Sequence, residues 1–197
     1  TKLAQSYDDD DMIDEANKLL DPYHKWLFQQ AFSSTSAIEM FITLAQINSS
    51  EIKSDDISYT SEQVYKILDD IDLSLYNNEQ AKQHTKIKIL FIQATILYYS
   101  LPYDAEMQIR PKTTVQAWQT DIQPKLELSK SKLTQAISLI KQYDIQTHLE
   151  EQVYIWLARV DAELGNYAAA DHYSELGINK VINIFGLQHP QTIKAYI

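Results

Sequence analysis

The chain has 197 residues, a length typical of one domain or of a segment of a longer repeat array. Hydrophobic residues make up 45% of it, which is enough for a continuous core and too many for a disordered tail. The formal net charge of -10 disfavours contact with a phosphate backbone, so nucleic acid is not an expected partner. The absence of cysteine excludes disulfides, thiolate metal sites and cysteine nucleophiles.

Two further features bear on location and chemistry. The first residues, TKLAQSYDDDD, lack the basic and apolar regions of a signal peptide, and the most apolar run, IKILFIQATILYY, is too short to cross a bilayer. We therefore expect no membrane insertion; a cytoplasmic location is favoured, and a bacterial periplasm stays open. Because the sequence starts at Thr1, we expect a segment of a longer protein.

The first 164 residues contain no glycine, which argues against a glycine-rich phosphate loop or a dinucleotide-binding turn.

Apolar residues recur at helical spacing along most of the chain, which predicts an all-α fold. A first helix is expected over residues 8–20, followed by an aromatic stripe around Trp26 after Pro22. The stretch SSTSAIEMFITLAQI begins with N-cap residues and predicts a helix to about Ile47. Residues 1–60 therefore form a region of N-terminal helices without a family assignment.

A polar loop, NSSEIKSDDISYT, precedes a helix predicted over SEQVYKILDDIDLSLY. The apolar stripe of that helix comprises Val64, Ile67, Leu68, Ile71 and Leu75. A long helix follows over NNEQAKQHTKIKILFIQATILYYS. Pro102 and Pro111 predict an interruption over residues 101–113, because two prolines cannot lie inside one straight helix.

The last part of the sequence predicts more helices in pairs. A broken helix crosses Pro124 and continues through KLELSKSKLTQAISLIKQY. THLEEQVYIWLARVDAEL and YAAADHYSELGINKVINIF form the final complete pair, joined at Gly165 and Asn166, which together mark a helix end. His189 and Pro190 are expected to begin one more helix.

An internal repeat relates residues 132–155 to residues 174–197. At an offset of 42 positions Leu139 aligns with Val181, Tyr143 with Phe185, and Tyr154 with Tyr196. A fixed period of this length predicts stacked helical units, each of which buries its apolar face against its neighbours.

Residues 154–173, YIWLARVDAELGNYAAADHY, resemble a tetratricopeptide repeat. The stretch GNYAAADHYSELGINKVINIFGLQHPQT is similar to the long, 42-residue variety of kinesin light chains and many bacterial signalling proteins. The clearest repeat spans residues 149–190. Leu157 and Ala158 match the first helix of the pattern. The residues that match its structural joints are Gly165, Tyr167, Ala170, Gly186, His189 and Pro190.

The resemblance implies that residues 61–197 form an α-α superhelix, a solenoid of helix pairs whose concave face binds a protein or peptide. The inner helix of the clearest repeat would present the binding residues Gln152, Ile155, Trp156, Arg159 and Glu163. Kinesin light chains hold a peptide backbone with asparagines where this chain has Ile155 and Trp156. We therefore expect a more apolar and aromatic groove here.

Among the aromatic residues, we assign Tyr98, Tyr99, Tyr154 and Trp118 to the core. Trp156 is equally compatible with the core and with a binding surface.

No motif in the sequence predicts catalysis, a metal or a cofactor. The five histidines lack ligand spacing, the DDDD run lacks the pattern of a calcium loop, and G-x-S-x-G is absent. The sequence therefore favours a non-enzymatic, protein-binding scaffold or regulatory module of a larger protein. The alternative is a domain that senses a small ligand or signal in a bacterial signalling protein, such as a kinase or transcriptional regulator.

Overall fold

A computed structural model describes residues 34–49, 61–101 and 117–187 of the chain. Several sequence predictions lie outside these residues. They are the helix over residues 8–20, the stripe around Trp26, the polar loop before Ser61, most of the predicted interruption at 101–113, and the joint at His189 and Pro190.

All regular structure in the described part of the chain is helical, which confirms the all-α prediction. The α-helices are α3 (Thr35–Ser49), α4 (Ser61–Asp69), α5 (Glu79–Tyr99), α7 (Gln123–Tyr143), α8 (Leu149–Glu163) and α9 (Tyr167–Phe185). Two short turns complete the set, the 3-10 helix η1 (Leu73–Leu75) and the π-helix η2 (Trp118–Ile122). None of these helices is long and apolar enough to cross a membrane.

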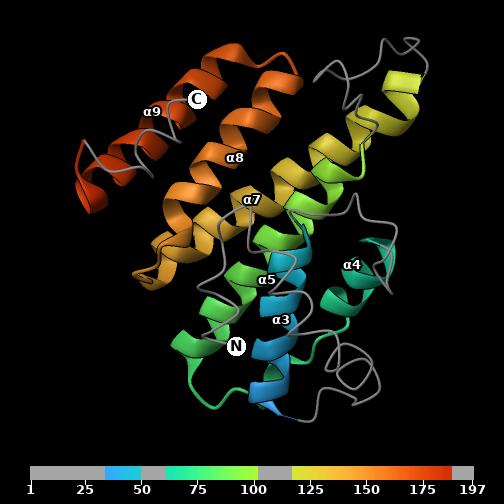
Figure 1. Cartoon of the computed structure of the whole chain (residues 1–197), viewed down its shortest axis with the longest axis vertical. Coiled ribbons are helices and arrows are strands. Elements are labelled where there is room, and N and C mark those ends of the chain that lie inside the picture. Colours follow the sequence, from blue (N-terminus) through green and yellow to red (C-terminus); the bar gives the residue numbers. More distant parts are fainter. Residues whose placement is uncertain (1–33, 50–60, 102–116, 188–197) are drawn as a thin grey trace.

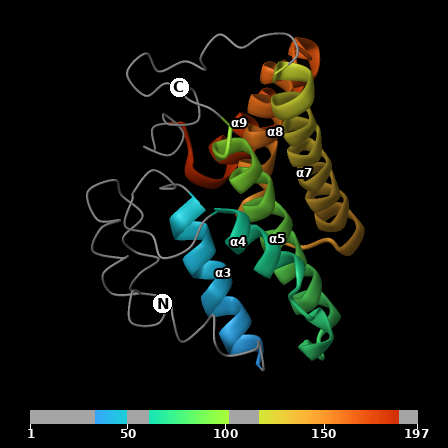
Figure 2. The same cartoon turned by 90° about the vertical axis from the view of Figure 1, so that its right-hand side faces the viewer.

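The helices pack as two antiparallel pairs with α3 and α4 alongside them. The most extensive contacts are those of α5 with α7 and of α8 with α9, and α7 joins the pairs by packing on α8 (Figure 1). Figure 2 shows α3 on the side of α5 that lies away from α7. Helix α5 is therefore central, and its residues 89–96 are all buried. A helix that is apolar all round is expected to have neighbours on every side.

Side chains cap the starts of α3 and α5. The Ser34 hydroxyl accepts a hydrogen bond from the backbone N–H of Ala37 at 3.2 Å, as the N-cap prediction requires. The side-chain carbonyl oxygen of Asn78 accepts a hydrogen bond from the backbone N–H of Ala81 at 3.0 Å. Each cap satisfies a backbone donor that has no partner inside its helix.

Within the described residues, α7, α8 and α9 end in left-handed or related backbone conformations. Gly165 has φ +79 and Gly186 has φ +82, which confirms the predicted helix ends. Asp144 ends α7 with φ 48 and ψ 44, the same left-handed region. Asp144 and Gly186 stand 42 positions apart (186 − 144), so equivalent positions of the sequence repeat both end a helix with positive φ.

Helix α4 is shorter than the sequence predicts. We expected helix over the whole of SEQVYKILDDIDLSLY, but α4 ends at Asp69. The Asp72 carboxylate accepts hydrogen bonds from the backbone N–H and the hydroxyl of Ser74, both at 2.8 Å, and this favours the separate turn η1. Such local bonds compete with helix continuation. The predicted stripe is split as a result, with Leu68 buried and Leu75 exposed.

The predicted break near Pro124 is a π-helical turn. The backbone N–H of Gln123 bonds to the carbonyl of Trp118, five residues earlier, and Pro124 lies in the first turn of α7. Proline has no N–H to donate and fits the first turn of a helix, so the wider turn before it accommodates the lost bond.

A polar network attaches α3 to α5. One oxygen of Glu39 accepts hydrogen bonds from the hydroxyls of Thr85 (2.7 Å) and Tyr76 (2.9 Å). The other lies 2.8 Å from Nζ of Lys88. Burial raises the pKa of Glu39, but these bonds outweigh it, and the pKa is lowered overall.

Candidate functional site

The last turn of α5 and the middle of α8 bring three aromatic rings together. The ring centroids of Tyr98 and Trp156 are 5.1 Å apart, those of Tyr99 and Trp156 5.4 Å, and those of Tyr98 and Tyr99 6.0 Å. All three pairs are edge-to-face, the geometry that aromatic rings favour. We refer to these three residues as the α5–α8 aromatic cluster.

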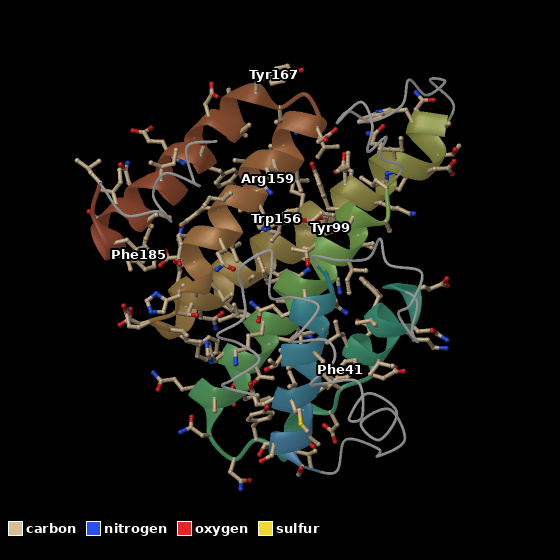
Figure 3. The ribbon with its side chains drawn as sticks, viewed as in Figure 1. Phe41, Tyr99, Trp156, Arg159, Tyr167 and Phe185 are labelled. Atoms are coloured by element: carbon tan, nitrogen blue, oxygen red, sulfur yellow. The ribbon has the colours of Figure 1, made fainter. Side chains whose placement is uncertain are left out.

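Arg159 extends this cluster with a positive charge. Its guanidinium carbon lies 5.2 Å from the Trp156 ring centroid, a cation–π distance (Figure 3). The Arg159 side chain is exposed and has no ion pair with any residue in the described part of the chain. Tyr99, beside it, is 40% exposed. A fork of guanidinium donors and two partly accessible rings therefore face solvent together.

Glu163 adds a carboxylate at the edge of the cluster. The Tyr98 hydroxyl donates a hydrogen bond to it at 3.1 Å, which ties the end of α5 to the last turn of α8. Burial raises the pKa of the Tyr99 phenol, and the Arg159 charge opposes that rise. Tyr99 is therefore a neutral phenol at neutral pH, able to donate and accept a hydrogen bond.

Of the five binding residues expected on α8, Trp156, Arg159 and Glu163 meet in this cluster. Gln152 is exposed one turn earlier, and Ile155 is half-buried. A β-carbon added to Gly177 would lie 2.9 Å from Cγ1 of Ile155, so Ile155 borders the packed face between α8 and α9.

The residues that match the helix joints of the tetratricopeptide pattern differ in their burial. Gly165 and Gly186 lie at helix ends, and Ala170 is buried where α9 packs. Tyr167 is 69% exposed at the start of α9. Of the two residues that match the first helix of the pattern, Leu157 is buried and Ala158 is half-buried.

The assignment of Tyr99 to the core is wrong. Tyr154 is buried as expected, and Tyr98 and Trp118 are half-buried, but Tyr99 is exposed at the end of α5. Two adjacent residues on a helix point about 100° apart, so Tyr99 turns away from the core that Tyr98 borders, although both rings reach Trp156. Two adjacent tyrosines at the end of an apolar helix therefore indicate that one of the two rings faces solvent.

The histidines and carboxylates in the described ranges do not gather into a metal site. No group of three or more histidine, aspartate or glutamate side chains among them could hold a metal ion. His84 is half-buried, 3.3 Å from the Thr147 hydroxyl, and burial lowers its pKa. His148 stacks on Phe185 with ring centroids 6.5 Å apart, and His172 is exposed on α9.

Comparison with known proteins identifies no relative. No protein-family model matches the chain, and no curated protein or solved structure matches it. The resemblance to tetratricopeptide repeats therefore stays a prediction, and the candidate site rests on its geometry.

Proposed function

We propose that the chain is a non-catalytic helical-repeat module that binds a protein or peptide at the α5–α8 aromatic cluster. In a superhelix of the tetratricopeptide type, the first helices of successive pairs lie side by side on the inner face. The pairing of α5 with α7 and of α8 with α9, together with contact between α5 and α8, fits that scheme. In this proposal α5 and α8 are the two inner helices.

The observation that carries the proposal is the exposed guanidinium of Arg159 over Trp156, next to the exposed ring of Tyr99. Tryptophan, tyrosine and arginine are the residues that most often dominate binding energy at protein interfaces. Edge-to-face packing holds the rings in place before binding, which lowers the entropy lost when a partner docks. A partner side chain could contact the rings while an acceptor group bonds to Arg159.

Selection of peptides from a random displayed library tests the proposal. Peptides enriched on the wild-type protein should bind Arg159→Glu at least about tenfold more weakly, because the charge and the cation–π contact are both lost. The melting temperature should not change, since Arg159 is exposed. Lys125→Glu is the matched control for net charge, because Lys125 lies on α7 outside the cluster. Its affinity for the peptides should equal that of the wild type.

Two results would contradict the proposal. One is a set of enriched peptides that bind wild-type and Arg159→Glu proteins equally well. The other is a marked fall in the melting temperature of Arg159→Glu with peptide binding retained, which would make Arg159 a structural residue.

A further inference from the structure

A second surface lies between the first half of α5 and the second half of α7. It is a groove of about 450 Å³, open to solvent, with η1 at one side. Its apolar floor is formed by Leu73, Leu90 and Leu139. No residue that lines it belongs to the α5–α8 aromatic cluster. The groove is therefore separate from the site proposed above.

Two lysines on α5 give this groove a positive edge. Lys82 and Lys86 both line it and are four residues apart, so they project from the same face of the helix. Lys82 is 3.8 Å from a carboxylate oxygen of Glu79, and its charge also contributes to the lowered pKa of Asp72, so two carboxylates outside the lining lie near it. Lys86 has no ion pair with any residue in the described ranges. Lys82 and Lys86 are the charged residues among those that line the groove, so the lining itself is basic over an apolar floor, on a chain of net charge -10.

The two hydroxyls of the groove already donate their single hydrogen within α7, and the Gln83 and Gln135 amides each donate one of their two hydrogens within their own helix. The Thr134 hydroxyl donates to the carbonyl of Lys130 at 2.8 Å, and the Ser138 hydroxyl donates to that of Thr134 at 3.0 Å. The Gln83 amide donates to Glu79 at 2.6 Å. Apart from these two amides, the neutral side chains of the groove offer an extended peptide no free donor for its backbone groups, and unpaired backbone groups are costly to bury. A helix satisfies its own backbone.

We propose that the groove between α5 and α7 docks an amphipathic helix of a partner protein. The apolar face of that helix carries leucine-sized side chains that lie on Leu73, Leu90 and Leu139. Its flank carries two carboxylates one helical turn apart, which pair with Lys82 and Lys86. A helix laid in a groove between two others is a common mode of peptide recognition, read by apolar anchors at helical spacing.

A synthetic peptide of roughly 16 residues, held helical by a side-chain bridge, tests this proposal, because free helices of that length are marginal. It presents leucines at three-and-four spacing flanked by two glutamates four positions apart, and carries a fluorophore for anisotropy titration. The control peptide has lysines in place of the two glutamates. We expect the glutamate peptide to bind the full chain and the lysine peptide to bind at least about tenfold more weakly.

Charge exchange on the protein makes the test specific. The double variant Lys82→Glu/Lys86→Glu should lose affinity for the glutamate peptide by about tenfold or more and gain affinity for the lysine peptide. Lys125→Glu/Lys141→Glu, with the same charge change on α7 outside the groove, should bind both peptides as the wild type does. Ser138→Trp fills the groove without changing charge and should abolish binding, with circular dichroism to show that it folds.

Three results would overturn the proposal. The first is equal affinity for the two peptides, and the second is unchanged binding by Lys82→Glu/Lys86→Glu. The third is lysine-dependent binding of dodecanoate without binding of the glutamate peptide, which would assign the groove to a small amphiphilic anion. Each of these leaves the Arg159 site untouched, because the two surfaces share no residue.

Discussion

Lys130 on α7 and Asp161 on α8 form an ion pair in which Nζ lies 2.6 Å from Oδ1. Asp161 is fully buried, and its other carboxylate oxygen has no hydrogen-bond partner. The side-chain amide of Asn166 donates to the same Oδ1 at 2.9 Å, and the Asn166 backbone N–H donates to the Asp161 carbonyl at 2.8 Å. One buried residue therefore links α7, α8 and the turn into α9.

Lys130→Met should lower the free energy of unfolding by about 2–4 kcal/mol, because it leaves a buried carboxylate without a counter-charge. Urea denaturation of the full chain measures this change. Lys66→Met on α4 is the control and should stay within about 0.5 kcal/mol of the wild type, as expected for an exposed position. Equal effects of the two substitutions would show that the pair contributes nothing measurable.

The two glycine helix ends should respond differently to asparagine. The backbone N–H of Gly165 donates to the carbonyl of Ala162, and the N–H of Asn166 donates to the carbonyl of Asp161. These two bonds are the pattern of a left-handed helix end, which asparagine tolerates. Gly186 has φ +82 and ψ 165, a region that is essentially restricted to glycine. No atom lies within 4 Å of a β-carbon added at either position, so the backbone alone determines the cost.

Gly186→Asn should therefore cost about 1–3 kcal/mol, and Gly186→Val at least as much, whereas Gly165→Asn should cost well under 1 kcal/mol. Thermal melts of the three variants test this order. Asn183→Val, at an exposed position in α9, controls for the effect of a β-branched side chain. Identical melts for Gly186→Val and the wild type would argue against the assigned helix end.

The fold was predictable where one residue type determines the local structure. Gly165 and Gly186 marked helix ends because positive φ is easy only for glycine. Asp144 gave no such signal, because aspartate adopts this conformation only in a suitable context. The early end of α4 was missed because apolar spacing continues to Leu75, and periodicity does not register the bonds between Asp72 and Ser74.

The candidate site was predictable only in part. Helical spacing placed Trp156, Arg159 and Glu163 on neighbouring positions of one helix. Tyr98 and Tyr99 reach the cluster from a helix more than 50 positions earlier in the sequence. No local pattern shows that these two helices meet, because their contact depends on how the pairs pack.

Gly177 lies where α9 packs on α8, and Gly177→Ala should destabilise the protein. Alanine favours a helix by about 1 kcal/mol over glycine. However, its β-carbon would lie 2.9 Å from Cγ1 of Ile155 and 3.3 Å from the carbonyl oxygen of Glu151. The backbone atom cannot move without shifting a helix, so we expect a net loss of about 1–2 kcal/mol. In an Ile155→Ala background the same substitution should cost less. If Gly177→Ala costs the same free energy of unfolding in the wild type and in the Ile155→Ala background, the close contact between positions 177 and 155 is contradicted.

Glu39 should make the protein less stable in acid. Its folded pKa is lowered below its ordinary value of 4.5, so its contribution is present above that value and is lost as pH falls through the folded pKa. Glu39→Gln should therefore lower stability near neutral pH, and the deficit should shrink below about pH 4.5. Urea unfolding across this pH range measures both. Glu62→Gln, at an exposed position of α4, should show no such trend. A deficit that is constant with pH would argue against an ionised Glu39 as the cause.

Glu151 should have the opposite effect. It is 5% exposed in the first turn of α8, and one of its carboxylate oxygens has no hydrogen-bond partner. Burial raises its pKa, Glu150 adds to the rise, and His148, Lys180 and the backbone N–H of Glu151 oppose it. The folded state therefore binds the proton more tightly than the unfolded chain. Stability falls as pH rises from the ordinary glutamate value of 4.5 to the raised folded pKa, and the loss is constant above it.

Glu151→Gln removes the ionisable group and so should remove this fall. The stability of Glu151→Gln relative to the wild type should rise with pH above about 4.5 and level off at the folded pKa of Glu151. Urea unfolding at closely spaced pH values gives this difference curve, and its upper plateau locates that pKa. Glu127→Gln, at an exposed position of α7, should give a flat curve. A flat curve for Glu151→Gln as well would mean that the Glu151 carboxylate is solvated in the folded protein, contrary to its burial in α8.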